Sequence, residues 1–302
     1  MNFLLSTISI LIAVAFYTIL ERKLLSYIQM RKGPNKVGFM GILQPFSDAL
    51  KLFNKNLISP ELMNFSFSYS TPPMSLLMII LMMSIIPFNY YSLIDNKHNI
   101  LLFFILSSMM VYFILMIGWS TNSKYCTIGS IRSVAQMISY EISFFLIILF
   151  IILLSNSFSF TQISENQYLL SFCWGNFILF FIWMTSCLAE TNRSPFDFAE
   201  GESELVSGFN VEYMGGWFAL IFLAEYMSML MLSMISIILF FNYLNKPTSI
   251  IILIMISIFL IWIRGTIPRF RYDMLMNLTW KLFLPITLMI IPLSMNISFF
   301  FS

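Results

Sequence analysis

Residues 134–156, VAQMISYEISFFLIILFIILLSN, decide the fold class of this chain. As a helix this stretch is about 35 Å long, enough to cross the roughly 30 Å hydrocarbon core of a bilayer. Its apolar residues run continuously, whereas a strand of a membrane barrel alternates apolar and polar residues. Glu141 is the only charged residue in the stretch. The pattern therefore predicts a membrane-spanning helix with one carboxylate inside it.

The rest of the chain has the same character. Of its 302 residues 59% are apolar and only 10% are charged, against roughly 25% charged in a soluble domain. We predict a single all-α integral membrane domain over residues 1–302, with inner loops at 21–70, 120–133, 190–216 and 264–279. Apolar runs with polar boundaries predict about eight transmembrane helices, at about 2–20, 71–88, 99–119, 134–156, 170–189, 217–241, 249–263 and 280–300.

The basic residues predict the orientation of these helices. Fourteen of the sixteen lysines and arginines follow the first, third, fifth and seventh helices, and only Lys97 and Lys246 fall on the other side. The positive-inside rule places the basic loops on the matrix or cytoplasmic side and both termini on the outer side. Ten of the fourteen acidic residues share the inner side, while Asp95 and Glu165 are outside.

Several kinds of site are not expected. Cys126, Cys173 and Cys187 lack the paired spacing of a disulfide, zinc or iron–sulfur framework, so we predict no metal site. No glycine-rich dinucleotide fingerprint is present, and the lone His98 is expected to be a solvated loop residue. The N-terminus lacks a basic region and a cleavage site, so no removable signal peptide is expected. We do not expect this chain by itself to bind NADH or carry electrons.

The loop after the fifth predicted helix is acidic and also rich in phenylalanine and valine. Six carboxylates accompany a single arginine, Arg193: Glu190, Asp197, Glu200, Glu202, Glu204 and Glu212. If the loop packs into the protein, crowding and desolvation raise the carboxyl pKa values toward neutrality. On a helix, Glu200 and Glu204 would share one face and titrate as a coupled set. The alternative is a solvated acidic patch that docks another subunit.

Two carboxylates fall inside predicted spans. Glu141 follows Ser139 and Tyr140, and Glu225 precedes Tyr226, so each has hydrogen-bonding neighbours. A charge at the bilayer centre costs at least about 2.5–3.5 kcal/mol, so such residues usually face protein or water and serve a function. With the acidic loop they suggest a proton relay from the inner face to mid-membrane. Alternatively, the spans are misplaced and both residues lie near an interface.

The sequence of the first inner loop predicts a separate helix within it. After the turn signal Gly33-Pro34-Asn35, apolar residues recur at helical spacing at Leu43, Phe46, Leu50 and Phe53. This pattern predicts an amphipathic helix in the membrane interface. This helix lies beside Glu21-Arg22-Lys23, which caps the inner end of the first helix. Two roles fit it: it frames the entrance for an amphipathic lipid, or it is a plain membrane anchor.

Three loop motifs resemble a known family. They are ERKLLSYIQMRKGPNKVGFMGILQPFSDALKLF (21–53), AETNRSPFDFAEGESELVSGFNVEY (189–213) and RGTIPRFRYDMLM (264–276). All three are similar to the inner loops of the subunit 1 family of mitochondrial NADH:ubiquinone oxidoreductase, respiratory complex I. The resemblance covers essentially the whole chain. Met274 departs from the family pattern, where a polar residue is expected.

The resemblance implies a core subunit of a proton-pumping enzyme in the mitochondrial inner membrane, with ubiquinone as substrate. No cofactor is bound covalently, because flavin and iron–sulfur clusters belong to partner subunits of the hydrophilic arm, and no catalytic residue lies in this chain alone. The other partners are the membrane proton-pumping subunits and lipid, and no nucleic acid is expected. Residues implied near the quinone access tunnel are Arg22, Asp48, Arg193, Phe222 and Arg264. Residues implied in proton transfer and coupling are Glu141, Glu190, Asp197, Glu200, Glu202, Glu204, Glu212 and Glu225.

Other classes remain as alternatives. A stand-alone proton or ion transporter would also place carboxylates in the membrane, but this chain lacks a second half with matching broken helices. A structural anchor for a soluble enzyme would not need Glu141 or Glu225. A membrane subunit of a related membrane-bound hydrogenase is the nearest alternative by ancestry.

Overall fold

The architecture comes from a computed structural model of the full chain. It describes residues 2–58, 60–87, 93–94, 96–168, 170–242 and 247–301, and it leaves the side chains of residues 2, 202–203 and 297–301 undescribed. The predicted outer positions of Asp95 and Lys246 lie outside these residues.

The described residues contain helices and no strand, which confirms the predicted all-α class. Within them, seven helical segments are long and apolar enough to cross a membrane. The elements in chain order are α1 (Asn2–Ile28), η1 (Phe39–Gly41), α2 (Gln44–Phe53), α3 (Phe65–Ile85), α4 (Asn99–Ser120), α5 (Lys124–Ser155), α6 (Phe160–Asn166), α7 (Phe172–Gly175), α8 (Phe177–Glu190), α9 (Glu202–Leu205), η2 (Gly208–Asn210), α10 (Gly215–Phe240), α11 (Pro247–Thr266), α12 (Tyr272–Leu278), η3 (Thr279–Phe283) and α13 (Leu284–Phe301).

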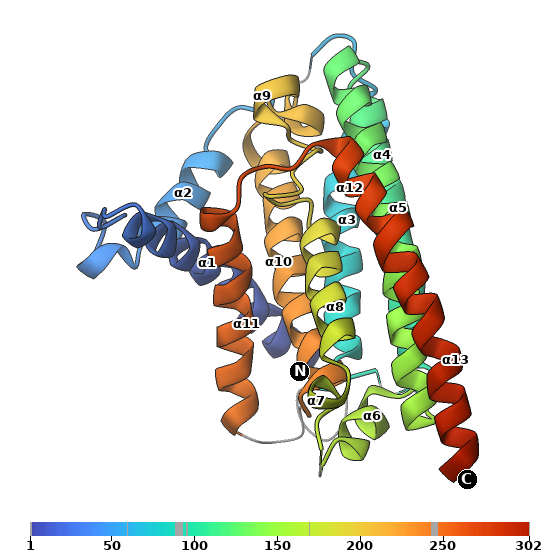
Figure 1. Ribbon diagram of the computed structural model, residues 1–302. Helices are drawn as coiled ribbons and strands as arrows, with labels where there is room; N and C mark the ends of the chain where they lie inside the picture. The colour runs from blue at the N-terminus through green and yellow to red at the C-terminus, as the bar shows by residue number, and fades with distance from the viewer. Residues whose placement is uncertain are drawn as a thin grey trace.

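The long helices form one bundle (Figure 1). In the view of Figure 1 both chain termini lie toward its lower end, while α9 and the turn before α12 lie at the upper end. In the most apolar stretch of α5, and in that of α10, half of the residues are buried. The corresponding share is only 11% in α1 and 17% in the α12–α13 segment. The core therefore lies around α3, α4, α5, α8 and α10, and the first and last helices run along its outside.

Aromatic packing fills the core. The Phe144 ring of α5 stacks on Trp183 of α8 with centroids 4.2 Å apart, and Phe240 of α10 meets the same indole. All three side chains are at most 3% exposed. Large rings of this kind contribute a major share of the apolar area that a bundle buries.

Helices continue into two of the predicted loops. Helix α5 begins at Lys124, so most of the expected loop 120–133 is helical, and α1 continues to Ile28 through the expected start of the loop 21–70. At 32 residues α5 is about 48 Å long, more than a bilayer needs. The reason is that a helix keeps its backbone hydrogen bonds in water, so it does not end where apolar residues give way to polar ones.

The fifth predicted span, 170–189, is divided. Asn176 adopts φ −136° and ψ 52° between the four-residue α7 and the 14-residue α8. Because α8 is only about 21 Å long, it is shorter than the hydrocarbon core of a bilayer. The amphipathic helix predicted in the first loop is confirmed as α2, with Leu50 and Phe53 exposed.

Candidate functional site

A buried carboxylate, Glu21, joins three elements of the bundle. It lies near the end of α1 and is 3% exposed. Its carboxylate forms an ion pair with Arg264 of α11 and accepts a hydrogen bond from the Tyr226 hydroxyl of α10. The sequence assigned Glu21 only to the cap of a helix end. The sequence feature that could have pointed to Glu21 is Tyr17. This residue lies one helical turn earlier on α1, and its ring packs edge-on against Tyr226.

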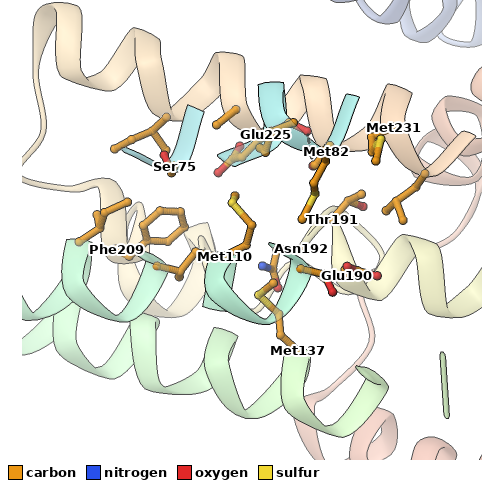
Figure 2. A pocket seen from close by; sticks show the side chains of 18 of the residues that line it. Ser75, Met82, Met110, Met137, Glu190, Thr191, Asn192, Phe209, Glu225 and Met231 are labelled. Atoms are coloured by element: carbon orange, nitrogen blue, oxygen red, sulfur yellow. Dashed lines mark hydrogen bonds between the residues drawn. The ribbon is translucent and has the colours of Figure 1, made fainter. Parts of the chain in front are cut away.

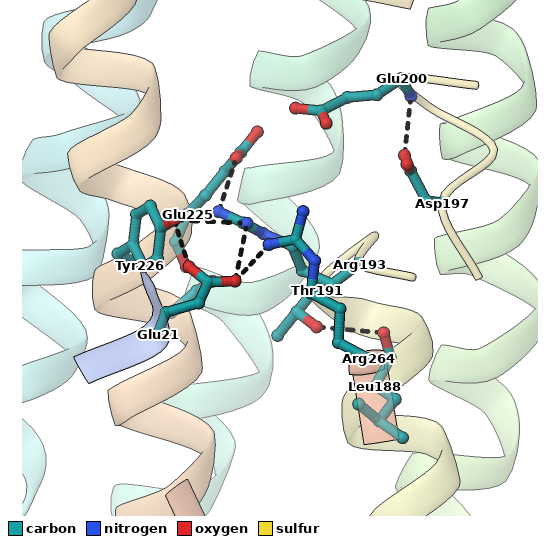
Figure 3. A network of polar contacts seen from close by, with 10 residues as sticks. Glu21, Leu188, Thr191, Arg193, Asp197, Glu200, Glu225, Tyr226 and Arg264 are labelled. Atoms are coloured by element: carbon teal, nitrogen blue, oxygen red, sulfur yellow. Dashed lines mark hydrogen bonds and ion pairs between the residues drawn. The ribbon is translucent and has the colours of Figure 1, made fainter. Parts of the chain in front are cut away.

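Arg193 connects Glu21 with the membrane carboxylate Glu225 (Figure 3). Its Nη1 atom is 3.7 Å from Glu21 Oε1, and its Nη2 atom is 3.6 Å from Glu225 Oε2. The guanidinium also lies over the Tyr226 ring, 4.3 Å from the centroid, in a cation–π contact. A single buried cation therefore sits between two carboxylates that come from different helices.

Glu225 and Glu190 line the same central cavity, of about 70 Å³, which has room for a few water molecules. Figure 2 shows Glu225 facing the cavity from α10, with Glu190 at one end and Ser75 and Phe209 at the other. Methionines make up much of the remaining wall: Met82, Met110, Met137 and Met231. The cavity therefore brings two predicted proton-path residues together inside a mostly apolar shell.

Glu141 of α5 interacts with Glu190. It is close enough for its charge to act on the Glu190 carboxylate, and it lines an open groove between α4 and α5 with Ser108 and Phe145. Along α5 it is about 24 Å from Tyr125 near the start of the helix, and its side chain is half-buried. Glu190 thus shares the cavity with Glu225 and interacts electrostatically with Glu141.

The start of the acidic loop packs inward, which is one of the two alternatives left open by the sequence. The Asp197 carboxylate is 8% exposed and lies 3.4 Å from Arg269, and it accepts a hydrogen bond from the backbone N–H of Glu200. Desolvation raises the pKa of Asp197 above its usual value, although Arg269 and backbone donors oppose the shift. In Figure 3 the Glu200 side chain turns toward Glu225, close enough to act on it electrostatically.

The expected shared face of Glu200 and Glu204 is wrong. Gly201 adopts φ +36° between them and begins the short α9 after Glu200. Glu204 instead points outward, 60% exposed, and pairs with Arg132 of α5 at 2.5 Å. Glu212 lines a separate hollow with Tyr213, and the side chain of Glu202 lies outside the described part of the structure. The loop is therefore buried at its beginning and exposed near α9.

The implied tunnel residues surround the meeting point of α1, α2 and α10. Arg22 of α1 and Asp48 of α2 form an ion pair at 2.7 Å that is largely exposed. Phe222 belongs to a row on α10 in which its ring lies 4.4 Å from that of Phe218 and 6.4 Å from that of Tyr226. The row ends at the network of Glu21 and Arg193. Met274, the departure from the family pattern, is exposed on α12.

Fold and site together define a multi-pass all-α membrane protein with a buried network of carboxylates and arginines at one end of its bundle. The family model described as NADH dehydrogenase matches residues 1–295. The chain belongs to that family.

Relatives from distant animals agree with this assignment. The chain is 50% identical to NADH-ubiquinone oxidoreductase chain 1 of Aedes aegypti over 99% of its own length and 93% of that protein. The chain 1 proteins of Locusta migratoria and Balaenoptera physalus are 47% and 45% identical, over 100% and 95% of this chain and 94% and 92% of theirs.

Proposed function

We propose that this chain is the membrane subunit of a mitochondrial NADH:ubiquinone oxidoreductase, and that it forms the membrane part of the quinone access tunnel. It would also couple quinone reduction to proton translocation. Family membership and the chain 1 relatives support the subunit assignment. Partner subunits carry the flavin and iron–sulfur clusters, and the inner loops face the matrix.

The position of Arg193 between Glu21 and Glu225 carries the coupling proposal. Quinone reduction places negative charge near the Glu21 end and requires protons. A change of charge there alters how strongly Arg193 is held by Glu225. Because Glu225 lines the cavity that also holds Glu190, protons released or taken up at Glu225 reach Glu190 and then Glu141.

The lining of the proposed tunnel fits an amphipathic substrate. The Phe218–Phe222–Tyr226 row offers flat apolar surfaces to a quinone ring and its tail, and it ends at charged groups that match the polar head. Helix α2 connects the two walls, since its Phe46 packs against Phe16 of α1 and its Phe53 lies beside Gly216 of α10. An apolar, exposed α2 suits an entrance that opens to the lipid.

The first prediction concerns Glu225→Gln in the assembled enzyme. We expect inhibitor-sensitive NADH:ubiquinone turnover and proton pumping to fall strongly, while reduction of a hydrophilic acceptor at the flavin stays normal. Glu165→Gln is the matched control, because Glu165 is an exposed carboxylate of α6 at the opposite end of the bundle.

Native gel separation and mass spectrometry first establish that each variant resides in the multi-subunit enzyme. Normal turnover with normal proton stoichiometry in Glu225→Gln would contradict the coupling role. Recovery of the wild-type chain alone or as a small oligomer would contradict the subunit assignment and favour a stand-alone transporter.

A further inference from the structure

Gln136 of α5 is a buried polar side chain that does not belong to the network of Glu21 and Arg193. It is 0% exposed. Its Nε2 atom donates to the carbonyl of Ala189 at 2.8 Å and to the carbonyl of Phe196 at 2.9 Å. A side-chain amide nitrogen carries two hydrogens, so it can serve two acceptors at once. Gln136 therefore holds two separate points of the chain.

These two carbonyls mark the ends of the segment 189–196, which leads from the last turn of α8 into the acidic loop. Fully extended, a segment of this length would span roughly 23 Å, yet both of its ends bond to one nitrogen atom. Within the segment, Glu190 lines the central cavity and Arg193 forms the ion pairs drawn in Figure 3. Gln136 thus closes into a loop the segment that carries both charged groups.

The backbone of this segment makes turns that do not join its two ends. The Ala189 carbonyl also accepts the N–H of Asn192, and the Phe196 carbonyl also accepts the N–H of Phe198. Each of these bonds closes a turn of two or three residues. Among the described residues, the side chain that bonds both ends is Gln136.

Aromatic packing supports one end of the segment independently of Gln136. Tyr140, one helical turn further along α5, lies with its ring 6.2 Å from that of Phe196, and the Phe196 ring lies 5.4 Å from that of Phe270. The N–H of Phe270 donates to the carbonyl of Pro195 at 3.0 Å. Loss of the Gln136 amide therefore loosens the loop at its Ala189 end and leaves the other end packed.

The partners of Gln136 show what its side chain contributes. Both partners are carbonyl oxygens, which only accept, so the amide nitrogen faces them and Oε1 is turned away. This oxygen is buried and has no hydrogen-bond partner in the described part of the chain. An unpaired buried acceptor costs free energy, and an apolar residue of similar size would fill the same space without that cost. The amide therefore contributes through its two hydrogen bonds.

We propose that Gln136 is a positioning residue, which fixes Glu190 and Arg193 relative to each other by holding the carbonyls of Ala189 and Phe196 together. The inference rests on the proposed function, which gives those two charged groups a shared task in coupling. Gln136 acts through them by geometry and not by a charge of its own. A displacement of about 1 Å can cost about 100-fold in rate, so a loosened loop lowers turnover.

The test uses Gln136→Met in the assembled enzyme. Methionine has a similar length and volume and carries no donor. We expect the kcat of inhibitor-sensitive NADH:ubiquinone turnover, per assembled enzyme, to fall several-fold while the KM for ubiquinone stays the same. This pattern indicates an interaction that matters in the transition state and not in substrate binding. Hydrogen exchange of the backbone amides in 189–196 should become faster.

Gln167→Met is the matched control. Gln167 is 2% exposed, and its Nε2 atom donates to the carbonyls of Ile238 and Leu239 at the end of α10, at 2.9 and 3.0 Å. It follows α6, at the lower end of the bundle in Figure 1. Its loss should reduce the amount of assembled enzyme and leave the kcat per assembled enzyme unchanged. The same result in Gln136→Met would show a purely structural role and overturn the inference.

A wild-type kcat or wild-type hydrogen exchange in Gln136→Met, with Glu225→Gln impaired, would overturn the positioning role and leave the proposed function standing. Normal turnover in both variants would overturn both. If Gln136→Met does not assemble, Gln136→Glu gives the same reading, because it keeps the shape of the side chain and offers at most one hydrogen to two carbonyls. A wild-type kcat in that variant would equally overturn the positioning role.

Discussion

At the scale of single residues, the ion pairs of Glu21 and Arg22, neighbours on α1, differ sharply in environment. The side chains of Glu21 and its partner Arg193 are 4% and 9% exposed, whereas those of Arg22 and Asp48 are 53% and 36% exposed. Exposed pairs contribute about 0–1 kcal/mol because water screens them and both side chains lose freedom. Removing one member of a buried pair leaves an uncompensated charge and costs about 3–5 kcal/mol.

The corresponding prediction compares Glu21→Ala with Asp48→Ala. Glu21→Ala leaves Arg193 and Arg264 without their shared carboxylate, so we expect a clearly lower thermal inactivation temperature of the solubilised enzyme. Asp48→Ala should change this temperature little. Equal losses in the two variants would show that burial of Glu21 does not determine its contribution.

Because the Asp197 carboxyl is buried, we expect the stability of the folded protein to depend on pH. Burial raises the pKa of this carboxyl in the folded protein above its unfolded value, about 3.9. The folded state therefore binds the proton more tightly than the unfolded state, and protonation of Asp197 stabilises the fold. This contribution is fully present below about pH 3.9 and is lost as the pH rises through the pKa of the folded state. Asp197→Asn removes the titration.

We therefore expect the stability of Asp197→Asn relative to wild type to improve as the pH rises from 4 toward neutrality, in thermal inactivation measured across that range. Asp273→Asn, at an exposed position on α12, is the control and should show no such trend. A relative stability of Asp197→Asn that falls with rising pH would mean that the pair with Arg269 outweighs the desolvation of the carboxylate.

At the scale of elements, the contact between α4 and α5 depends on one glycine. A Cβ atom added at Gly118 of α4 would lie 2.3 Å from Cβ of Ser130 on α5. Small residues at such points let helices in membranes approach closely. The position matters for the site because α4 and α5 provide Ile117, Met110 and Met137 to the cavity wall.

Gly118→Ala should therefore force α4 and α5 apart. Overpacking of this kind costs about 1–3 kcal/mol, so we expect less assembled enzyme on native gels and a lower inactivation temperature. Gly175→Ala is the matched control, since a Cβ there meets no atom within 4 Å. A Gly118→Ala enzyme with wild-type yield and stability would mean that the helices adjust without loss.

At the scale of the whole molecule, apolar side chains face outward and charges are buried. Large exposed hydrophobic residues cover α1 and α11, among them Leu4, Ile250 and Met255, while Glu21 and Arg193 are inside. This distribution suits a surface covered by lipid and neighbouring subunits. The polar network concentrates at one end of the bundle, where Arg193 of the acidic loop meets Glu21 of α1, Glu225 of α10 and Arg264 of α11.

The sequence by itself determined the fold class, the approximate spans, helix α2 and most of the charged residues that gather in the site. These features are local, because the length of an apolar run and the spacing of apolar residues along a helix can be counted in one segment. The motifs also determined the family. They did not determine helix ends such as Lys124 and Ile28, because a helix can continue beyond the apolar run.

Only the tertiary structure decided which charges meet. Glu21 and Arg264 are 243 residues apart, so the sequence around either residue does not indicate that the two form an ion pair. Glu200 and Glu204 are four residues apart, yet the turn at Gly201 sends one inward and the other to Arg132. Burial and pairing depend on contacts between distant parts of the chain, and those contacts exist only once the bundle has packed.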